Sequence, residues 1–182
     1  MSTLKSLMEG YRPGDVPRVT RSGESYQQTY DYFYPQLSEL VARYKAHGAH
    51  DQTARLIRDD FEKALRRYHE YCIEQNQGAH YIEVGLDSKT KTEFEHVIPV
   101  KVVRDAVFCD RMTIDQALNM PSCKLSKVKH DQLANLGLAK ESECPYYFWR
   151  RYKALGIKIA TRSGDPVNLD TWNLDTHYEY FG

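Results

Sequence analysis

Residues 92–99 read TEFEHVIP, and this stretch decides how the middle of the chain is interpreted. Polar and apolar residues alternate through it, which is typical of a half-buried β-strand. Glu95 and His96 stand side by side near the end of this strand, and Pro99 suits the first turn of a following helix. A carboxylate and an imidazole in this position are either half of an active site or an ordinary polar pair at a strand edge.

A second stretch, CKLSKVKHDQL at residues 123–133, predicts a short strand followed at once by a helix. Ser126 is the expected N-cap of that helix. His130 lies four residues further on and shares a helix face with Leu133, so its side chain is expected to point partly inward. Together with another expected strand at 80–86, these segments place an acid–histidine pair on a strand and a second histidine on a helix.

Two amphipathic helices precede this region. The first is expected from Ser25 to Gly48, with a break or kink at Pro35, and the second from His50 to Gly78. Their apolar residues recur at helical spacing: Leu37, Leu40, Val41 and Tyr44 in the first helix, and Leu56, Phe61, Leu65, Tyr68 and Cys72 in the second. We expect the two helices to form an antiparallel hairpin.

The fold class expected from these patterns is α+β. A helical hairpin at 25–78 packs on a small ββα core at 79–137, and a further helix and a tail follow at 138–182. Residues 1–24 are rich in Gly, Pro, Ser and Arg and are expected to form a flexible arm. Thr113 is the expected N-cap of a short helix that begins at Ile114. Residues 25–182 are thus expected to make one domain.

Composition supports a folded protein of the cytoplasm. The chain has 182 residues, of which 41% are hydrophobic and 27% charged. It contains neither an apolar run of the roughly 20 residues that a membrane span needs nor an apolar signal segment at its start. The four cysteines form no CxxC pair, which favours reduced thiols over a zinc ribbon.

Charge is distributed unevenly although the net charge is zero. Residues 99–162 contain twelve Lys and Arg against six Asp and Glu, whereas residues 163–182 contain four acids and neither Lys nor Arg. A basic segment inside a neutral protein fits a face that contacts phosphates. A lysine-rich, solvated helix surface would produce the same pattern.

The motif residues Glu95, His96, Ile98 and Pro99, with His130 further on, resemble those of the HNH nucleases, also called His-Me finger or ββα-metal endonucleases. The resemblance covers roughly residues 80–137, and in general appearance it extends to small phage-type members. It implies that His96 is the general base and that Glu95 and His130 hold a divalent metal, Mg²⁺ or Mn²⁺.

The chemistry of phosphodiester cleavage explains these residue types. A neutral imidazole, whose ordinary pKa is near ~6.5, can take a proton from the attacking water. A hard divalent cation can stabilise the charge on the phosphate and on the leaving oxygen. Lys127 and Lys129, beside the expected site, are candidate phosphate contacts, as are Arg150 and Arg151. The aromatic residues around these arginines, Phe148, Trp149 and Tyr152, are expected in the core.

The chain also departs from the family pattern. Its first acid is Glu, where Asp is commoner, and the zinc-binding CxxC pairs of many members are absent. Neither Asn119 nor Asn135 lies just ahead of the helix, where the middle Asn of the pattern belongs and where lysines stand instead. His69 and His80 are expected on the surface, and His177 is expected to pack in the tail.

The favoured function is a metal-dependent endonuclease that hydrolyses DNA and acts as a homodimer, with the arm or the tyrosine-rich first helix as the interface. Two alternatives stay open. The chain can be a non-catalytic, phage-type DNA- or protein-binding protein that retains the nuclease-like fold, or it can be a ribonuclease.

Overall fold

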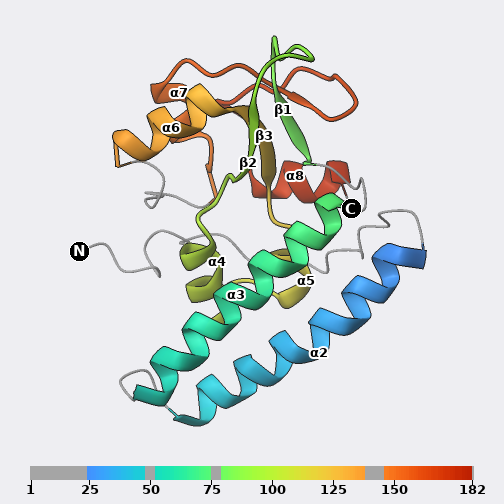
Figure 1. The fold of residues 1–182 in the computed structure, drawn as a ribbon. Coiled ribbons are helices and arrows are strands. Elements are labelled where there is room, and N and C mark those ends of the chain that lie inside the picture. Colours follow the sequence, from blue (N-terminus) through green and yellow to red (C-terminus); the bar gives the residue numbers. More distant parts are fainter. Residues whose placement is uncertain (1–23, 48–51, 75–78, 138–145, 182) are drawn as a thin grey trace. The chain divides into compact units, whose positions relative to one another are not determined.

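The computed structural model describes residues 24–47, 52–74, 79–137 and 146–181 (Figure 1). The expected arm at 1–24 falls almost wholly outside them. The described residues form two compact units. Of the described residues, the helical unit contains 24–47, 52–74 and 100–119, and the sheet unit contains 79–99, 120–137 and 146–181. The expected α+β class is confirmed, but the segment at 100–119, expected in the ββα core, belongs to the helical unit.

Two long helices dominate the helical unit: α2, Glu24–His47, and α3, Gln52–Glu74. They contact each other along their length as the expected hairpin (Figure 1). The helix α2 continues through Pro35, so the expected break is absent; Pro35 is exposed, and the carbonyl of Asp31 that loses its hydrogen bond also belongs to an exposed residue.

The core of the helical unit follows the predicted stripes in part, since Leu40, Val41 and Tyr44 of the first stripe are only half-buried. Leu37, Phe61 and Leu65 are fully buried, as expected. Leu56, however, is 59% exposed, and Ile57 takes the core position instead. Ile57 lies four residues before Phe61, whereas Leu56 lies five before it, so Ile57 is the one that continues the stripe.

Two shorter helices complete the helical unit, α4 at Val100–Phe108 and α5 at Ile114–Leu118. Thr113 caps α5 as predicted: its hydroxyl accepts a hydrogen bond from the backbone N–H of Gln116, and the Gln116 side chain accepts one from the backbone of Thr113. This reciprocal pair satisfies two N–H groups that the first turn would otherwise leave without partners.

We expect Thr113→Ala to lower the free energy of unfolding by about 1 kcal/mol, because the cap acceptor is lost. Urea unfolding followed by far-ultraviolet circular dichroism measures this change. Thr113→Ser is the matched control, since it keeps the hydroxyl and should unfold like the parent protein. Equal losses in both variants would mean that the methyl group, and not the cap, is responsible.

A four-stranded sheet forms the centre of the other unit. Its strands are β1 at Tyr81–Glu83, β2 at Thr92–His96, β3 at Ser122–Ser126 and β4 at Ile159–Thr161. Their order is β2-β3-β1-β4, with β2 at one edge. The strands β1 and β2 follow each other in the chain but do not pair, because β3 lies between them, antiparallel to β2 and parallel to β1.

Three helices belong to the sheet unit: α6 at Lys127–Asn135, α7 at Arg150–Ala154 and α8 at Leu174–Phe181. Ser126 caps α6 as predicted, through its hydroxyl and the backbone N–H of Lys129. The strands β2 and β3 and the helix α6 therefore make a ββα arrangement, with α6 in contact with both strands. The helix α8 lies in the tail, where the sequence patterns indicated none.

The core of the sheet unit contains buried aromatic residues and histidines. Trp149, Tyr152 and Phe148 are buried, as expected. His80 is also fully buried, as is His69 in the helical unit, so the surface positions expected for both are wrong. His177 packs in the tail as expected, and its Nδ1 lies 2.7 Å from the hydroxyl of Tyr81. That hydroxyl also accepts a hydrogen bond from the indole of Trp172, which explains why a polar cluster is tolerated there.

Candidate functional site

Glu95 is the centre of the candidate site in the sheet unit. Its side chain is 12% exposed, and each of its two carboxylate oxygens has a different partner. Oε2 lies 3.3 Å from Nε2 of His130, and Oε1 accepts a hydrogen bond of 2.6 Å from the guanidinium of Arg151. Glu95 and His130 therefore meet although 35 positions separate them in the sequence.

His130 lies between two carboxylates. Its position near the start of α6, fixed by the Ser126 cap, directs Nε2 toward Glu95, while Nδ1 lies 3.6 Å from Oδ1 of Asp131. A hydrogen bond from Lys127 lowers the pKa of Asp131, and His130 adds to this effect. The 3.6 Å separation is longer than a hydrogen bond, and Nδ1 has no hydrogen-bond partner among the described residues, so Glu95 is the carboxylate that orients the ring.

Arg151 is buried, which contradicts the surface position predicted from the sequence. It was expected outside, in contact with nucleic acid, but its side chain is 4% exposed and its guanidinium pairs with Glu95. The same guanidinium donates hydrogen bonds to the backbone carbonyls of His96 and Val97, so it fastens the end of β2 to α7. Its own helix does not indicate these partners, which lie 54 to 56 positions earlier in the chain.

His96 lies on the opposite face of the sheet from Glu95. The strand β2 continues through His96, so the expected departure from strand geometry is absent and neighbouring side chains alternate. The His96 ring packs edge-on against Phe94, two residues before it, with 5.0 Å between centroids. Because β2 is the edge strand, both side chains still border the same edge of the sheet.

The remaining predicted contacts are placed as follows. Arg150 is exposed, as expected. Lys127 forms an ion pair of 3.2 Å with Asp131, and the ammonium group of Lys129 donates a hydrogen bond of 3.3 Å to the carbonyl of Leu155. Their role in nucleic-acid binding stays a prediction.

The spacing of Glu95 and His130 fits two neighbouring ligands of one small cation. Ligands at ~2.1 Å from an ion and roughly 100° apart are separated by about 3.2 Å. The charge balance is less favourable, because Arg151 already supplies a positive charge to the carboxylate. Among the described residues there is no cluster of three or more His, Cys, Asp or Glu side chains that could hold a metal ion, so water or substrate would have to complete the coordination.

Cys123 and Tyr152 pack beside the site without contributing chemistry. Cys123 is the cross-strand partner of Glu95, and Tyr152 follows Arg151 on α7. Burial raises the pKa of the Cys123 thiol and that of the Tyr152 hydroxyl well above their ordinary values. The raised pKa of Cys123 disfavours the thiolate form that a nucleophilic cysteine needs.

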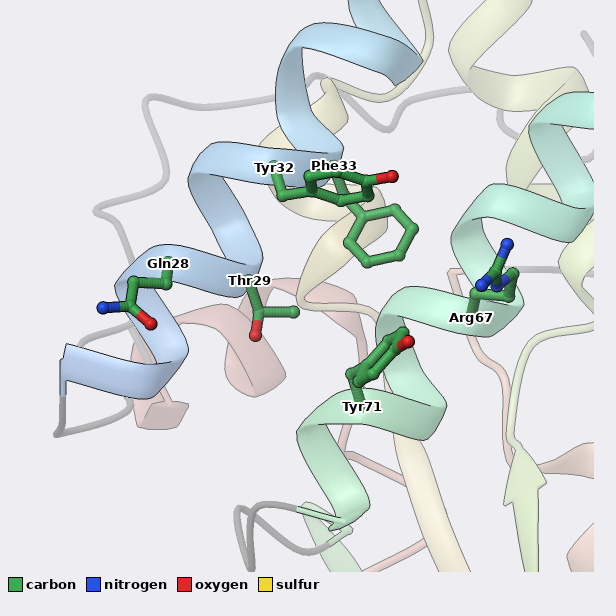
Figure 2. A pocket seen from close by; sticks show the side chains of 6 residues that line it. All are labelled: Gln28, Thr29, Tyr32, Phe33, Arg67 and Tyr71. Atoms are coloured by element: carbon green, nitrogen blue, oxygen red, sulfur yellow. The ribbon is translucent and has the colours of Figure 1, made fainter.

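The helical unit has a pocket of about 300 Å³ between α2 and α3 (Figure 2). Phe33 is buried there, whereas Tyr32 and Tyr71 are exposed by 65% and 41%. The lining residues include neither carboxylate nor imidazole, so the pocket lacks a general base and metal ligands; they are Gln28, Thr29, Tyr32, Phe33, Arg67 and Tyr71. Tyr32 belongs to the tyrosine-rich first helix, which the sequence predicts as a dimer interface; this role stays a prediction.

No helix in the part of the chain that the structure describes is long and apolar enough to cross a lipid bilayer. Comparison of the chain with family models, with curated proteins and with solved structures found no match.

Proposed function

We propose that this protein is a metal-dependent endonuclease that hydrolyses phosphodiester bonds in DNA. The observation that carries the proposal is the 3.3 Å approach of His130 to Glu95 across an antiparallel strand pair and the helix that follows it. This arrangement supplies an imidazole and a carboxylate at one edge of a sheet, with His96 on the opposite face of the same edge strand.

Each residue has a separate task in this proposal. Glu95 and His130 would hold Mg²⁺ or Mn²⁺, which supplies Lewis-acid stabilisation of the charged phosphate. Arg151 keeps the carboxylate of Glu95 in place. His96 accepts a proton from the attacking water at the edge of β2.

A second candidate function is favoured by the ion pair between Arg151 and Glu95. A buried guanidinium at 2.6 Å neutralises the carboxylate without any metal. A protein that retains the ββα fold but binds DNA or a partner protein without cutting would have this arrangement.

Cleavage in the presence and absence of metal separates the two candidates. Purified protein is incubated with supercoiled plasmid and, in parallel, with a structured RNA, in Mg²⁺, in Mn²⁺ or in EDTA. We expect nicked plasmid with either metal and none in EDTA. His130→Ala should abolish nicking and also abolish Mn²⁺ binding measured by calorimetry, whereas His47→Ala in the helical unit should change neither.

Three results would contradict the proposal in different ways. Binding of nucleic acid without cleavage in any metal would favour the second candidate. Preferential cleavage of RNA would identify a ribonuclease. Full nicking activity in EDTA would remove the metal from the mechanism.

A further inference from the structure

The strand register divides the side chains of the sheet between two faces. Phe94 pairs with Lys124, Lys124 with Ile82, and Ile82 with Ala160, so these four side chains form one row across the sheet. The next row consists of Glu95, Cys123, Tyr81 and Thr161. Because directly paired residues point to the same face and successive residues alternate, the two rows lie on opposite faces.

Among the described residues, the helices α6 and α7 cover one of these faces. Arg151 on α7 and His130 on α6 both reach Glu95, and Trp149 packs edge-on against Tyr81. We call this the covered face. The exposed or half-exposed part of the other face, which we call the open face, consists of Ile82, Thr92, Phe94, His96, Lys124, Ser126 and Ala160, together with Lys158 next to β4. Ser122 is on the same side by register but is buried, because it forms a hydrogen bond with His80, which packs against Phe181 of α8.

Charge is segregated between the two faces. Glu83, Glu93 and Glu95 are the carboxylates of the four strands, and the register places all three on the covered face. The open face has Lys124 in the centre of the sheet and Lys158 at its edge, where the Lys158 carbonyl accepts a hydrogen bond from Val84 and so continues the β1–β4 pairing. The open face is therefore positive although the protein as a whole is neutral.

The two lysines of the open face differ from those of α6. Lys124 and Lys158 are exposed, and their ammonium groups make no ion pair or hydrogen bond with any residue in the described ranges. Lys127 and Lys129, by contrast, are engaged with Asp131 and with the carbonyl of Leu155. An incoming phosphate therefore meets ammonium groups without a described partner on the open face, whereas the ammonium groups of α6 already contact Asp131 and the carbonyl of Leu155.

Phe94 adds a base-stacking surface to these cations. It is half-exposed, lies directly beside Lys124 in the row, and packs against His96. We propose that the open face binds single-stranded nucleic acid, with a base stacked on Phe94 and the flanking phosphates at Lys124 and Lys158. The inference rests on the proposed function in that it brings the substrate to His96, which lies on this face.

Stacking of a base on Phe94 requires a single-stranded substrate. A base can stack on Phe94 only if its π-face is free, whereas paired bases in a duplex have their faces covered by their neighbours. The open face therefore specifies a strand that is unpaired at the point of contact.

Binding is tested in EDTA, so that cleavage does not interfere. The anisotropy of a labelled 20-nucleotide oligo-dT is titrated with protein at several salt concentrations. Lys124→Gln/Lys158→Gln should reduce the slope of log affinity against log salt by about 1.4, since each contact on a single strand contributes about 0.7. Phe94→Leu should weaken binding by about 5- to 150-fold.

Lys127→Gln/Lys129→Gln is the comparison variant: it removes the same charge from α6, where both ammonium groups already have partners in the protein, and it should reduce the slope less than the open-face variant. Trp149 and Trp172 are the two tryptophans of the chain and both lie in the sheet unit, so their fluorescence shows whether each variant keeps that unit folded. A larger loss in the α6 variant than in the open-face variant would overturn the proposal.

Competitors provide a second criterion. Duplex DNA that competes as well as oligo-dT would show that stacking plays no part, and polyglutamate that competes equally would show a general anion surface. Wild-type protein that binds oligo-dT through the open face without cutting in Mn²⁺ would leave this inference standing and remove the nuclease. If the open-face variants cut and bind as well as wild type, the nuclease proposal would stand and this inference would be wrong.

Discussion

His96→Ala is expected to remain folded and to bind oligo-dT, but to nick plasmid about 10²- to 10⁴-fold more slowly than wild type, the usual contribution of a positioned proton acceptor. His96 is half-exposed on the edge strand, so removing its ring leaves the buried core of the sheet intact. The measurement is the single-turnover nicking rate in saturating Mn²⁺, with tryptophan fluorescence as the check on folding.

Two comparisons distinguish proton transfer from packing in this experiment. Added imidazole should restore part of the rate of His96→Ala, because it replaces the lost base, and it should not affect His47→Ala. Phe94→Leu disturbs the same ring contact without removing an imidazole, so free imidazole should not rescue it. Undiminished nicking by His96→Ala would mean that His96 only packs against Phe94.

Local features of this fold were readable from the sequence. The strand at Ser122–Ser126, the Ser126 and Thr113 caps and the helices that follow them appear as expected, because each depends on residues within a few positions of one another. The meeting of Glu95 and His130 was also predicted. That prediction came from the resemblance to the ββα-metal endonucleases, together with the placement of Glu95 at a strand end and of His130 on a helix capped by Ser126.

Features set by distant partners were not readable in the same way. Periodicity predicts that residues 92–96 form a strand, but not that this strand pairs with β3 rather than with β1. The same limit applies to Arg151. Its burial depends on a carboxylate 56 positions earlier and on two backbone carbonyls at the end of β2, none of which its own helix indicates.

The metal proposal is affected most by this missed contact. Sequence patterns assigned a cation as the partner of Glu95 and placed Arg151 on the nucleic acid, whereas the guanidinium itself is the cation that Glu95 contacts. A buried carboxylate needs a compensating charge, and either an arginine or a metal ion can provide it. How much Arg151 contributes to stability is therefore directly relevant to function.

Arg151→Met is expected to lower the free energy of unfolding of the sheet unit by about 3–5 kcal/mol, because it leaves Glu95 buried without its charged partner. The side chains are 4% and 12% exposed, so little screening by water reduces the loss. Methionine keeps much of the apolar stem of arginine, which limits the cavity contribution. Urea unfolding followed by tryptophan fluorescence reports on this unit alone, since Trp149 and Trp172 both lie in it.

Arg150→Met is the matched control, because the neighbouring arginine is exposed and its loss should change stability by no more than about 0.5 kcal/mol. The double variant Glu95→Gln/Arg151→Met removes both charges and should recover much of the loss, because a neutral amide no longer requires a compensating cation. If Arg151→Met alone unfolds like wild type, Glu95 is already neutralised by another cation, and His130 between its two carboxylates is the group to examine next. If the double variant is no more stable than Arg151→Met, the loss comes instead from the hydrogen bonds to the carbonyls of His96 and Val97, and the guanidinium acts chiefly as a backbone clamp at the end of β2.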